Sequence, residues 1–320
     1  MVRTDGPWLD PELAVALEAI PHHERPQATI DPDRIEGARA RLRRAVELPD
    51  GRPVRSEAVR IVRADNTFLD LRLHRPAGEA RRSSAPGGPV LVWLHGGGYL
   101  LGSAPSDPRV EQEYADRVGC AVVGVDYRTA PEHPHPAPLE DVLLTLAWLR
   151  DGGGGGGGAP SWVALGGESA GAGLAAATVL AAKDIDFQLL VAPMLDDRTD
   201  EATSPAVDAL GLWSGELNRR AWALYQRPEA SSAPLASAAR AAALDGSPPA
   251  YLDVGSADLF CRETVAYAQR LDQHGVPVEL HVWPGAYHGF YEVAPTAAVS
   301  LAAKAARVRA LRRALRRAGD

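Results

Sequence analysis

Apolar residues fall into two kinds of short run, which predict two kinds of strand. At 59–62 and 69–73, apolar and polar positions alternate, as in strands with one buried face. Later runs are almost continuously apolar, as expected of parallel strands covered on both faces. These runs lie at 90–94, 121–125, 162–165, 189–191 and 251–254. The pattern predicts an antiparallel pair followed by parallel strands.

Helix-forming segments separate the continuous runs. They lie at about 109–118, 138–150, 170–183 and 262–274. Strands that alternate with helices are typical of a sheet with right-handed crossovers. We therefore expect an α/β fold with a mostly parallel sheet.

Two segments depart from this alternation. Helical patterns at 11–19 and 32–48 precede the first strand signal, and the stretch at 196–247 is too long for an ordinary crossover and has its own helical run at 215–225. We expect both segments to form a helical cap over the carboxyl ends of the strands. The predicted division assigns 1–52 and 196–247 to the cap, and 53–195 and 248–320 to the core.

Two further segments carry no obvious chemistry. A run of seven glycines at 152–158 predicts a flexible surface connection. The stretch at 298–318 predicts a terminal helix, which we interpret as docked through one apolar face, with its arginines largely in solvent. A basic amphipathic helix that binds a membrane or a partner is the alternative. The expected apolar face consists of Leu301, Val308, Leu311 and Leu315.

Composition and charge restrict the class of function. A net charge of -7 and a pI near 5.7 give no general attraction to nucleic acid or to an anionic membrane. The only cysteines, Cys120 and Cys261, argue against a disulfide framework and fit a reducing compartment. The sequence shows neither a membrane-spanning run nor a signal peptide. We expect a cytoplasmic protein that acts on a small molecule, without a nucleic-acid partner or stable membrane association.

A Gly-x-Ser-x-Gly pentapeptide stands between a strand-like run and a helix-like run. It reads Gly167-Glu168-Ser169-Ala170-Gly171. A sharp strand-to-helix turn at this place would expose Ser169 as a nucleophile, and glycine on both sides would avoid clashes in the crowded turn. By itself the motif is equally consistent with an ordinary turn in a glycine-rich chain.

An acyl-transfer serine also needs donors for the oxyanion that forms on its substrate. The run His95-Gly96-Gly97-Gly98-Tyr99 follows the first parallel strand. Without β-carbons in the way, the N–H groups of Gly97 and Gly98 can approach a carbonyl oxygen, together with the N–H of Ala170. We predict that these three groups form an oxyanion hole.

The base and the acid of a catalytic triad are expected in loops that follow strands. Among nine histidines, His288 is the candidate base because it comes after the strand-like run at 279–283. Asp258, in the loop after the preceding strand, is the candidate to orient His288. Its alternative role is to cap the helix that follows. The chain order Ser169, Asp258, His288 suits this sheet topology.

Together these motifs resemble the hormone-sensitive-lipase-like family of α/β-hydrolases, in its bacterial carboxylesterase branch. The resemblance covers the chain from about residue 55 and rests on four signatures in order: the run at 95–99, the run at 126–132, the pentapeptide at 167–171 and His288-Gly289-Phe290. It implies an α/β-hydrolase fold with a mostly parallel eight-stranded sheet flanked by helices and a helical cap. It also implies a Ser169–His288–Asp258 triad, no cofactor and no metal.

The resemblance also assigns supporting roles and shows a departure. It implies that Tyr127 and Arg128 brace the loops beside the site. The family usually has aspartate or threonine before the nucleophile, where this chain has Glu168. The sequence does not predict what that extra methylene does.

We therefore expect a serine carboxylesterase that cleaves short- to medium-chain acyl esters of small molecules. A lipase, or a deacetylase acting on an acetylated natural product, is the alternative, and a non-catalytic ligand-binding protein is a remote one. An exposed sheet edge near the last strand is compatible with a homodimer. The residues expected to contact the substrate are Tyr99, Leu212, Trp213, Leu217 and Tyr287. The members of this set from the insertion, together with Tyr225, are equally consistent with the cap's own core.

Overall fold

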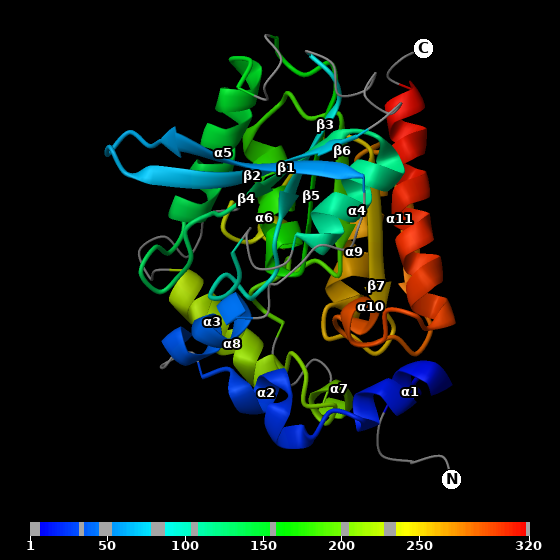
Figure 1. The fold of residues 1–320 in the computed structure, drawn as a ribbon. Coiled ribbons are helices and arrows are strands. Elements are labelled where there is room, and N and C mark those ends of the chain that lie inside the picture. The colour runs from blue at the N-terminus through cyan, green and yellow to red at the C-terminus, as the bar shows by residue number, and fades with distance from the viewer. Residues whose placement is uncertain are drawn as a thin grey trace.

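Among the residues that the structure describes, eight strands form one sheet in the order β1-β2-β4-β3-β5-β6-β7-β8 (Figure 1). The structure is a computed structural model. It describes residues 7–31, 35–44, 53–77, 87–103, 108–153, 158–199, 205–226 and 235–317. Most of the predicted glycine connection, residues 154–157, lies outside these ranges.

The sheet is antiparallel at one edge and parallel elsewhere, as predicted. β1 (Val54–Val62) and β2 (Phe68–Pro76) pair antiparallel along their full length, and β2 continues antiparallel to β4 (Ala121–Val125). All remaining neighbours are parallel. The other strands are β3 (Val90–Leu94), β5 (Val163–Glu168), β6 (Phe187–Val191), β7 (Ala250–Gly255) and β8 (Val278–Trp283). The predicted fold class is confirmed.

Alternate side chains of the central strands enter two apolar cores, one on each face of the sheet. Along β3, Val90, Val92 and Leu94 belong to one core, and Leu91 and Trp93 to the other. This arrangement explains why the central runs are continuously apolar. Helices α5 (Ala137–Arg150), α6 (Ala170–Ala181) and α9 (Cys261–Gln273) close the first core, and α4 (Arg109–Val118) and α11 (Ala298–Arg317) close the second (Figure 1). Within the described ranges, no helix combines the length and the apolarity needed to cross a bilayer.

The C-terminal helix α11 docks through a stripe that includes three of the four predicted residues, the third being the partly buried Leu315. Val308 and Leu311 are buried as expected, but Leu301 is 55% exposed. Arg307, which was not expected to face the core, is only 4% exposed. It can be buried because its guanidinium pairs with Asp253 of β7. The apolar pattern of the helix alone carries no sign of that distant partner.

The N-terminal helices and the insertion lie together beyond the carboxyl ends of the parallel strands (Figure 1). The elements there are η1 (His22–Glu24), α2 (Pro26–Thr29), α3 (Ile35–Arg44), α7 (Pro205–Asp208) and α8 (Gly215–Tyr225). Arg25 joins the two segments, because its Nη1 donates to the Leu210 carbonyl at 2.8 Å and its Nη2 to the Leu17 carbonyl at 2.9 Å. Arg39 of α3 ties the cap to the core through Glu132, at 2.9 Å.

Helix α1 (Pro11–Glu18) contacts the core as well as the cap. Asp10 caps its first turn, and the Asp10 N–H donates to the Gly285 carbonyl at 3.1 Å. The Leu13 carbonyl accepts from Tyr287 Oη at 3.2 Å. The N-terminal segment therefore packs on the loop that follows β8. The domain boundaries given in the sequence analysis stay a prediction.

Candidate active site

Ser169 occupies a strained turn between β5 and α6. Its φ of +53° and ψ of -120° lie in a region that residues other than glycine rarely adopt. Three backbone hydrogen bonds hold it there: its N–H donates to the Val191 carbonyl at 2.8 Å, and its carbonyl accepts from Gly173 and Met194, both at 3.0 Å. Strain that the surroundings impose in this way is typical of functional sites.

The two glycines of the pentapeptide are required by close packing, as the sequence suggested. A β-carbon on Gly167 would stand 2.6 Å from the Leu94 carbonyl oxygen, and one on Gly171 would stand 2.2 Å from it. Both distances are far below van der Waals contact. The turn therefore needs glycine on each side of the serine.

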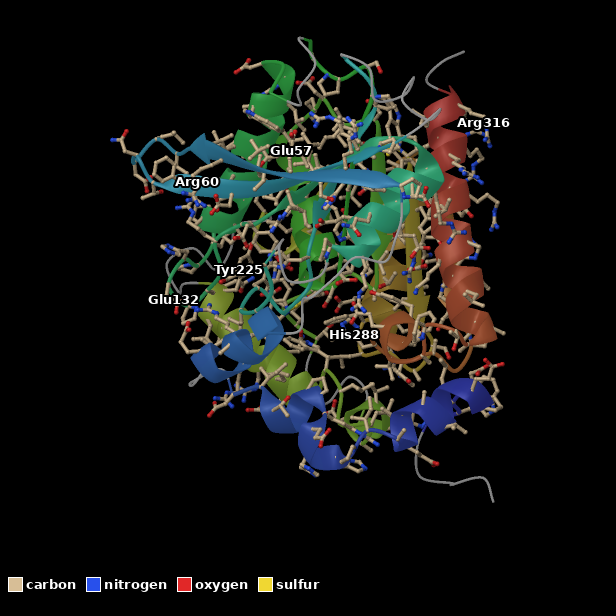
Figure 2. The ribbon with its side chains drawn as sticks, in the orientation of Figure 1. Glu57, Arg60, Glu132, Tyr225, His288 and Arg316 are labelled. Carbon is tan, nitrogen blue, oxygen red and sulfur yellow. The ribbon has the colours of Figure 1, made fainter. Side chains whose placement is uncertain are left out.

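Ser169, His288 and Asp258 form one chain of hydrogen bonds. His288 Nε2 lies 3.1 Å from Ser169 Oγ, and His288 Nδ1 lies 2.8 Å from Asp258 Oδ2. Because a carboxylate only accepts, Nδ1 carries the proton and Nε2 is free to accept from the serine. Figure 2 shows His288 beyond the strand ends, between the sheet and the cap helices.

Asp258 is held by its own loop, as an orienting carboxylate must be. Its Oδ1 accepts from the Phe260 N–H at 3.0 Å, which leaves Oδ2 for the imidazole. The N-cap position of α9 is Phe260, not Asp258, and no side chain caps this helix.

Three acidic residues act on the pKa of His288. Burial alone lowers the pKa of this imidazole, but Asp258, Glu292 and Glu168 favour the charged form and raise the pKa above its usual value. Asp258 contributes most among them, through both its charge and its hydrogen bond. The site therefore favours an imidazolium.

The glycine loop after β3 has a backbone that needs glycine. Gly97 and Gly98 have φ of +117° and +62°. A β-carbon on Gly98 would stand 2.0 Å from the Trp213 ring, and one on the neighbouring Gly96 would stand 3.4 Å from Ser169 Cβ. The loop therefore passes directly beside the serine. Within the described ranges, the structure records no backbone acceptor for the N–H groups of Gly97, Gly98 and Ala170.

Tyr127 and Arg128 contact the surrounding loops. Tyr127 Oη donates to the His95 carbonyl at 2.7 Å, and its ring stacks on the His95 imidazole with centroids 4.1 Å apart. Burial lowers the pKa of His95 to about 4, so this ring stays neutral. Arg128 Nε donates to Asp141 of α5 at 3.0 Å.

A cavity of about 540 Å³ lies beside Ser169, His288 and the glycine loop. Gly97, Gly98, Ser169 and His288 line one part of it, and apolar side chains of the cap line another. The apolar lining residues from the cap are Ile20, Pro26, Ile30, Ala38, Leu212 and Trp213. A volume of this size suits a small-molecule ligand.

Two of the five predicted substrate contacts line the cavity, and three do not. Leu212 and Trp213 are in its wall. Tyr99, Leu217 and Tyr287 are buried and are not among the residues that line it. The Tyr99 ring stacks on Tyr225 of α8 at 3.8 Å between centroids, so these large side chains fill the junction of cap and core.

The structure adds Tyr291 and Glu292 to the cavity wall. Both belong to α10 (Phe290–Val293), the short helix directly after His288. Their signal in the sequence was their spacing. They follow His288 by three and four residues, a separation that one helical turn brings to the same side.

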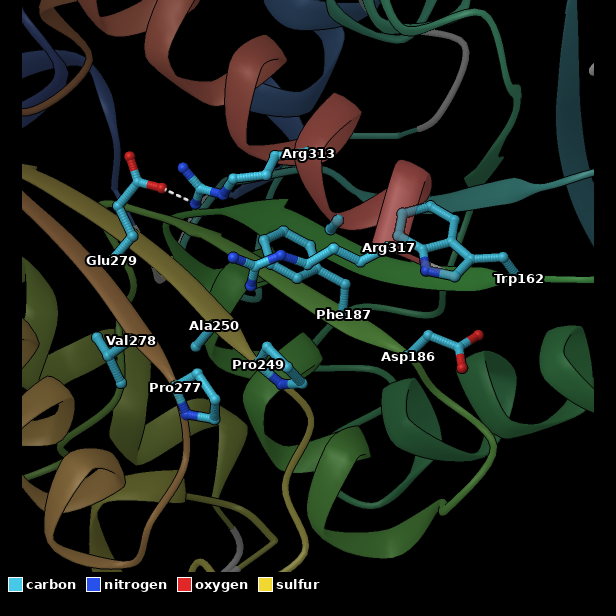
Figure 3. A pocket seen from close by; sticks show the side chains of 11 residues that line it. Trp162, Asp186, Phe187, Pro249, Ala250, Pro277, Val278, Glu279, Arg313 and Arg317 are labelled. Carbon is cyan, nitrogen blue, oxygen red and sulfur yellow. Dashed lines mark hydrogen bonds and ion pairs between the residues drawn. The ribbon is translucent and has the colours of Figure 1, made fainter. Parts of the chain in front are cut away.

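A second cavity, of about 460 Å³, lies at the opposite ends of the strands (Figure 3). Its floor includes Trp162, Phe187, Pro249 and Pro277, which stand at the starts of β5 to β8. Three of its charged groups have partners: Glu279 pairs with Arg313, and Asp186 accepts from the Val163 N–H at 2.8 Å. The described lining contains no serine, histidine or cysteine.

A family model for the alpha/beta hydrolase fold matches residues 91–292. The chain belongs to the α/β-hydrolase family. The hormone-sensitive-lipase-like branch that the four signatures indicate is confirmed. Esterase LipI of Mycobacterium tuberculosis is 32% identical, over 89% of each chain, and carboxylesterase NlhH of the same species is 32% identical, over 97% of each. Among solved structures, a bacterial heroin esterase superposes with a TM-score of 0.82 at 35% identity, over 96% of this chain and 98% of that one.

Proposed function

We propose that this α/β-hydrolase is a serine carboxylesterase that hydrolyses short- to medium-chain acyl esters of small molecules. The observation that carries the proposal is the hydrogen-bonded chain from Ser169 through His288 to Asp258, which opens onto a cavity beside the glycine loop. The similarity to proteins named esterase and carboxylesterase supports the same reaction class.

In the first half of the reaction, Ser169 becomes acylated. His288 Nε2 takes the proton of Ser169 Oγ while Oγ bonds to the ester carbonyl carbon. The negative charge that develops on the carbonyl oxygen is stabilised by the N–H groups of Gly97, Gly98 and Ala170. The imidazolium then protonates the leaving alkoxide, and the alcohol departs.

In the second half, water releases the acid. His288 takes a proton from a water molecule, and the resulting hydroxide attacks the acyl carbon. The imidazolium returns its proton to Ser169 Oγ when the acid leaves. Asp258 keeps the same ring tautomer throughout and stabilises the charged ring in both halves.

Hydrolysis of p-nitrophenyl acetate tests the assignment of the nucleophile. Ser169→Ala is expected to lower kcat by about 10³-fold or more. Ser161→Ala is the matched control and should keep wild-type kcat, because Ser161 is an exposed serine two residues before β5, at the end of the strand far from Ser169. A Ser169→Ala variant with wild-type activity would refute the proposal.

The apolar side chains of the cap that line the cavity are also compatible with a lipase. The preferred acyl-chain length distinguishes a carboxylesterase from a lipase. Trp213 closes the cavity against Gly98, and its Nε1 donates to Asn218 Oδ1 at 3.1 Å, which fixes the ring. We expect kcat/KM to peak at short to medium acyl chains, and Trp213→Ala to shift preference toward longer chains by about 10-fold. A wild-type optimum on long-chain esters favours a lipase, and activity on acetyl esters alone favours a deacetylase.

We further propose that two copies pair through the β8 edge. Among the described strands β8 pairs only with β7, and Leu280 and Val282 on it are 36% and 39% exposed. Light scattering should give a dimer for the wild type and a monomer for Val282→Lys. A monomeric wild type would refute this pairing.

A cytoplasmic location is likewise a proposal. Cys120 and Cys261 are both free thiols, which fits a reducing compartment. Fractionation of the source cells tests it, and recovery of the protein outside the cytoplasm would refute it.

A further inference from the structure

Glu168, the residue whose effect the sequence did not predict, reaches an unexpected partner. It ends β5, directly before Ser169, and its Oε2 accepts from Tyr291 Oη at 2.9 Å. Its Cγ lies 3.3 Å from the place where a β-carbon on Gly96 would stand. The carboxylate is therefore held between the glycine loop and α10.

Tyr291 also contacts a buried cation. The Arg307 guanidinium carbon lies 4.1 Å from the Tyr291 ring centroid, within cation–π range. Arg307 in turn donates to both carboxylate oxygens of Asp253, through Nε at 2.7 Å and Nη2 at 3.1 Å. A continuous line of contacts therefore runs from the nucleophile turn to α11 and β7.

Neither Tyr291 nor Arg307 changes protonation near neutral pH. Burial, with Glu168 beside it, raises the pKa of Tyr291 well above its usual value, so Oη keeps its proton and donates. Burial lowers the pKa of Arg307, but Asp253 more than compensates and the pKa is raised. Arg307 therefore stays a cation behind the tyrosine ring.

The charged and titratable groups around this line come from several elements. Those that face His288 are Asp258, Glu292 and Glu168. Those that share a small cavity of about 20 Å³ with Glu168 are Glu113 and Tyr114 of α4, Tyr291 of α10, and Lys304 and Arg307 of α11. Glu168 belongs to both sets, so through Tyr291 it links the buried Arg307–Asp253 pair to the base, His288.

We propose that Glu168 is a positioning residue of the esterase site, which Tyr291 and the Arg307–Asp253 pair hold beside the nucleophile turn, in the wall of the cavity that His288 also lines. The inference rests on the proposed function. It accounts for the extra methylene of Glu168 relative to aspartate. The glutamate reaches Tyr291 Oη, whereas the shorter aspartate would leave that hydroxyl without its acceptor. The charge then adds to that of Asp258 at the moment the imidazolium forms.

Two substitutions distinguish the effect of the Glu168 charge from the effect of its side-chain length. Glu168→Gln keeps the length and an acceptor for Tyr291 but removes the charge, so the acid limb of kcat/KM should move about half a pH unit lower. Glu168→Asp keeps the charge but loses the reach. Its kcat should fall about 3- to 10-fold, with the acid limb close to that of the wild type.

Tyr291→Phe tests the connection, and Tyr251→Phe is its matched control. Tyr251 Oη donates to Asp253 Oδ2 at 3.1 Å, so its removal deletes one hydroxyl from the far end of the same network. Tyr291→Phe should lower kcat as Glu168→Asp does, and the double variant should be no slower than either single one. Tyr251→Phe should keep the wild-type profile and kcat.

The experiment records pH profiles of kcat and kcat/KM for p-nitrophenyl acetate, together with Tm for every variant. An acid limb of Glu168→Gln that coincides with the wild type, or losses of Glu168→Asp and Tyr291→Phe that simply multiply, would overturn the inference. If Glu168→Gln does not fold, Tyr291→Phe decides, because wild-type kcat in that variant also overturns it. A wild type that neither hydrolyses esters nor reacts with a fluorophosphonate at Ser169 would instead refute the proposed function.

Discussion

The two cavities at opposite ends of the sheet have similar volumes, about 540 and 460 Å³, but very different walls. At the carboxyl ends of the strands, the backbone of Ser169 is strained, and two glycines with positive φ lie beside it. At the other ends, the lining consists of apolar side chains, two prolines and a few charged groups, among them the Glu279–Arg313 pair (Figure 3). Volume alone therefore does not mark a functional site in this fold.

The direction of the chain explains the difference. In a parallel sheet, loops that leave the carboxyl ends of strands meet at one edge and lead into helix N-termini. Helix α6 begins at Ala170, so the positive end of its dipole points to the place where negative charge develops on the substrate. The opposite edge collects the starts of strands, and none of the described residues that line its cavity belongs to the first turn of a helix.

The largest expected effect is on kcat, and it comes from comparing one aspartate-to-asparagine change at each end of the sheet. Asp258→Asn disrupts the tautomer that His288 needs, and kcat should fall about 10⁴-fold. Asp186→Asn, in the other cavity, keeps an oxygen for the Val163 N–H and should leave kcat within about twofold. Steady-state kinetics on one ester compares them. Equal losses would show that the two ends are not distinct.

A smaller loss is expected when the oxyanion loop is displaced. Gly98→Ala brings a β-carbon against the Trp213 ring at a φ of +62°, and kcat should fall about 10²- to 10³-fold. Gly275→Ala is the control, because Gly275 has a similar φ of +74° but nothing within 4 Å of a β-carbon. The control isolates backbone strain and should keep wild-type kcat. A Gly98→Ala variant as active as Gly275→Ala would remove the loop from the mechanism.

The pH dependence should report the environment of His288 at the active end. The base must be neutral, so kcat/KM falls as the pH drops through the pKa of His288. Since the neighbouring acids raise that pKa, the midpoint of the acid limb should lie above pH ~6.5. A midpoint well below that value would contradict the electrostatic account of the site.

The smallest effect is expected at the opposite cavity. Arg313→Ala removes the ion pair with Glu279, which is partly exposed on both sides. Such pairs contribute about 0 to 1 kcal/mol, so Tm should change little and kcat/KM should stay within about twofold. Thermal unfolding and esterase assays check both. A large change in kcat/KM would mean that this cavity communicates with the active end.

The sequence predicted the elements and the triad because both depend on local patterns. The continuous apolar run at 90–94 matches β3, and Ser169, Asp258 and His288 each follow a recognisable strand. Two of the predicted substrate contacts, Tyr99 and Tyr287, are buried and are not among the residues that line the cavity. The sequence places them next to the site but does not give their depth. The burial of Arg307 depends on Asp253, a partner on another element, which no helical periodicity reveals.

Covalent labelling of Ser169 tests the central claim most directly. The wild type is treated with a fluorophosphonate, and its intact mass and labelled peptide are determined beside those of Ser169→Ala and Ser161→Ala. The account predicts one adduct per chain, on Ser169, in the wild type and in Ser161→Ala, and none in Ser169→Ala. A folded wild type that takes no label, or a label that persists in Ser169→Ala, would contradict it.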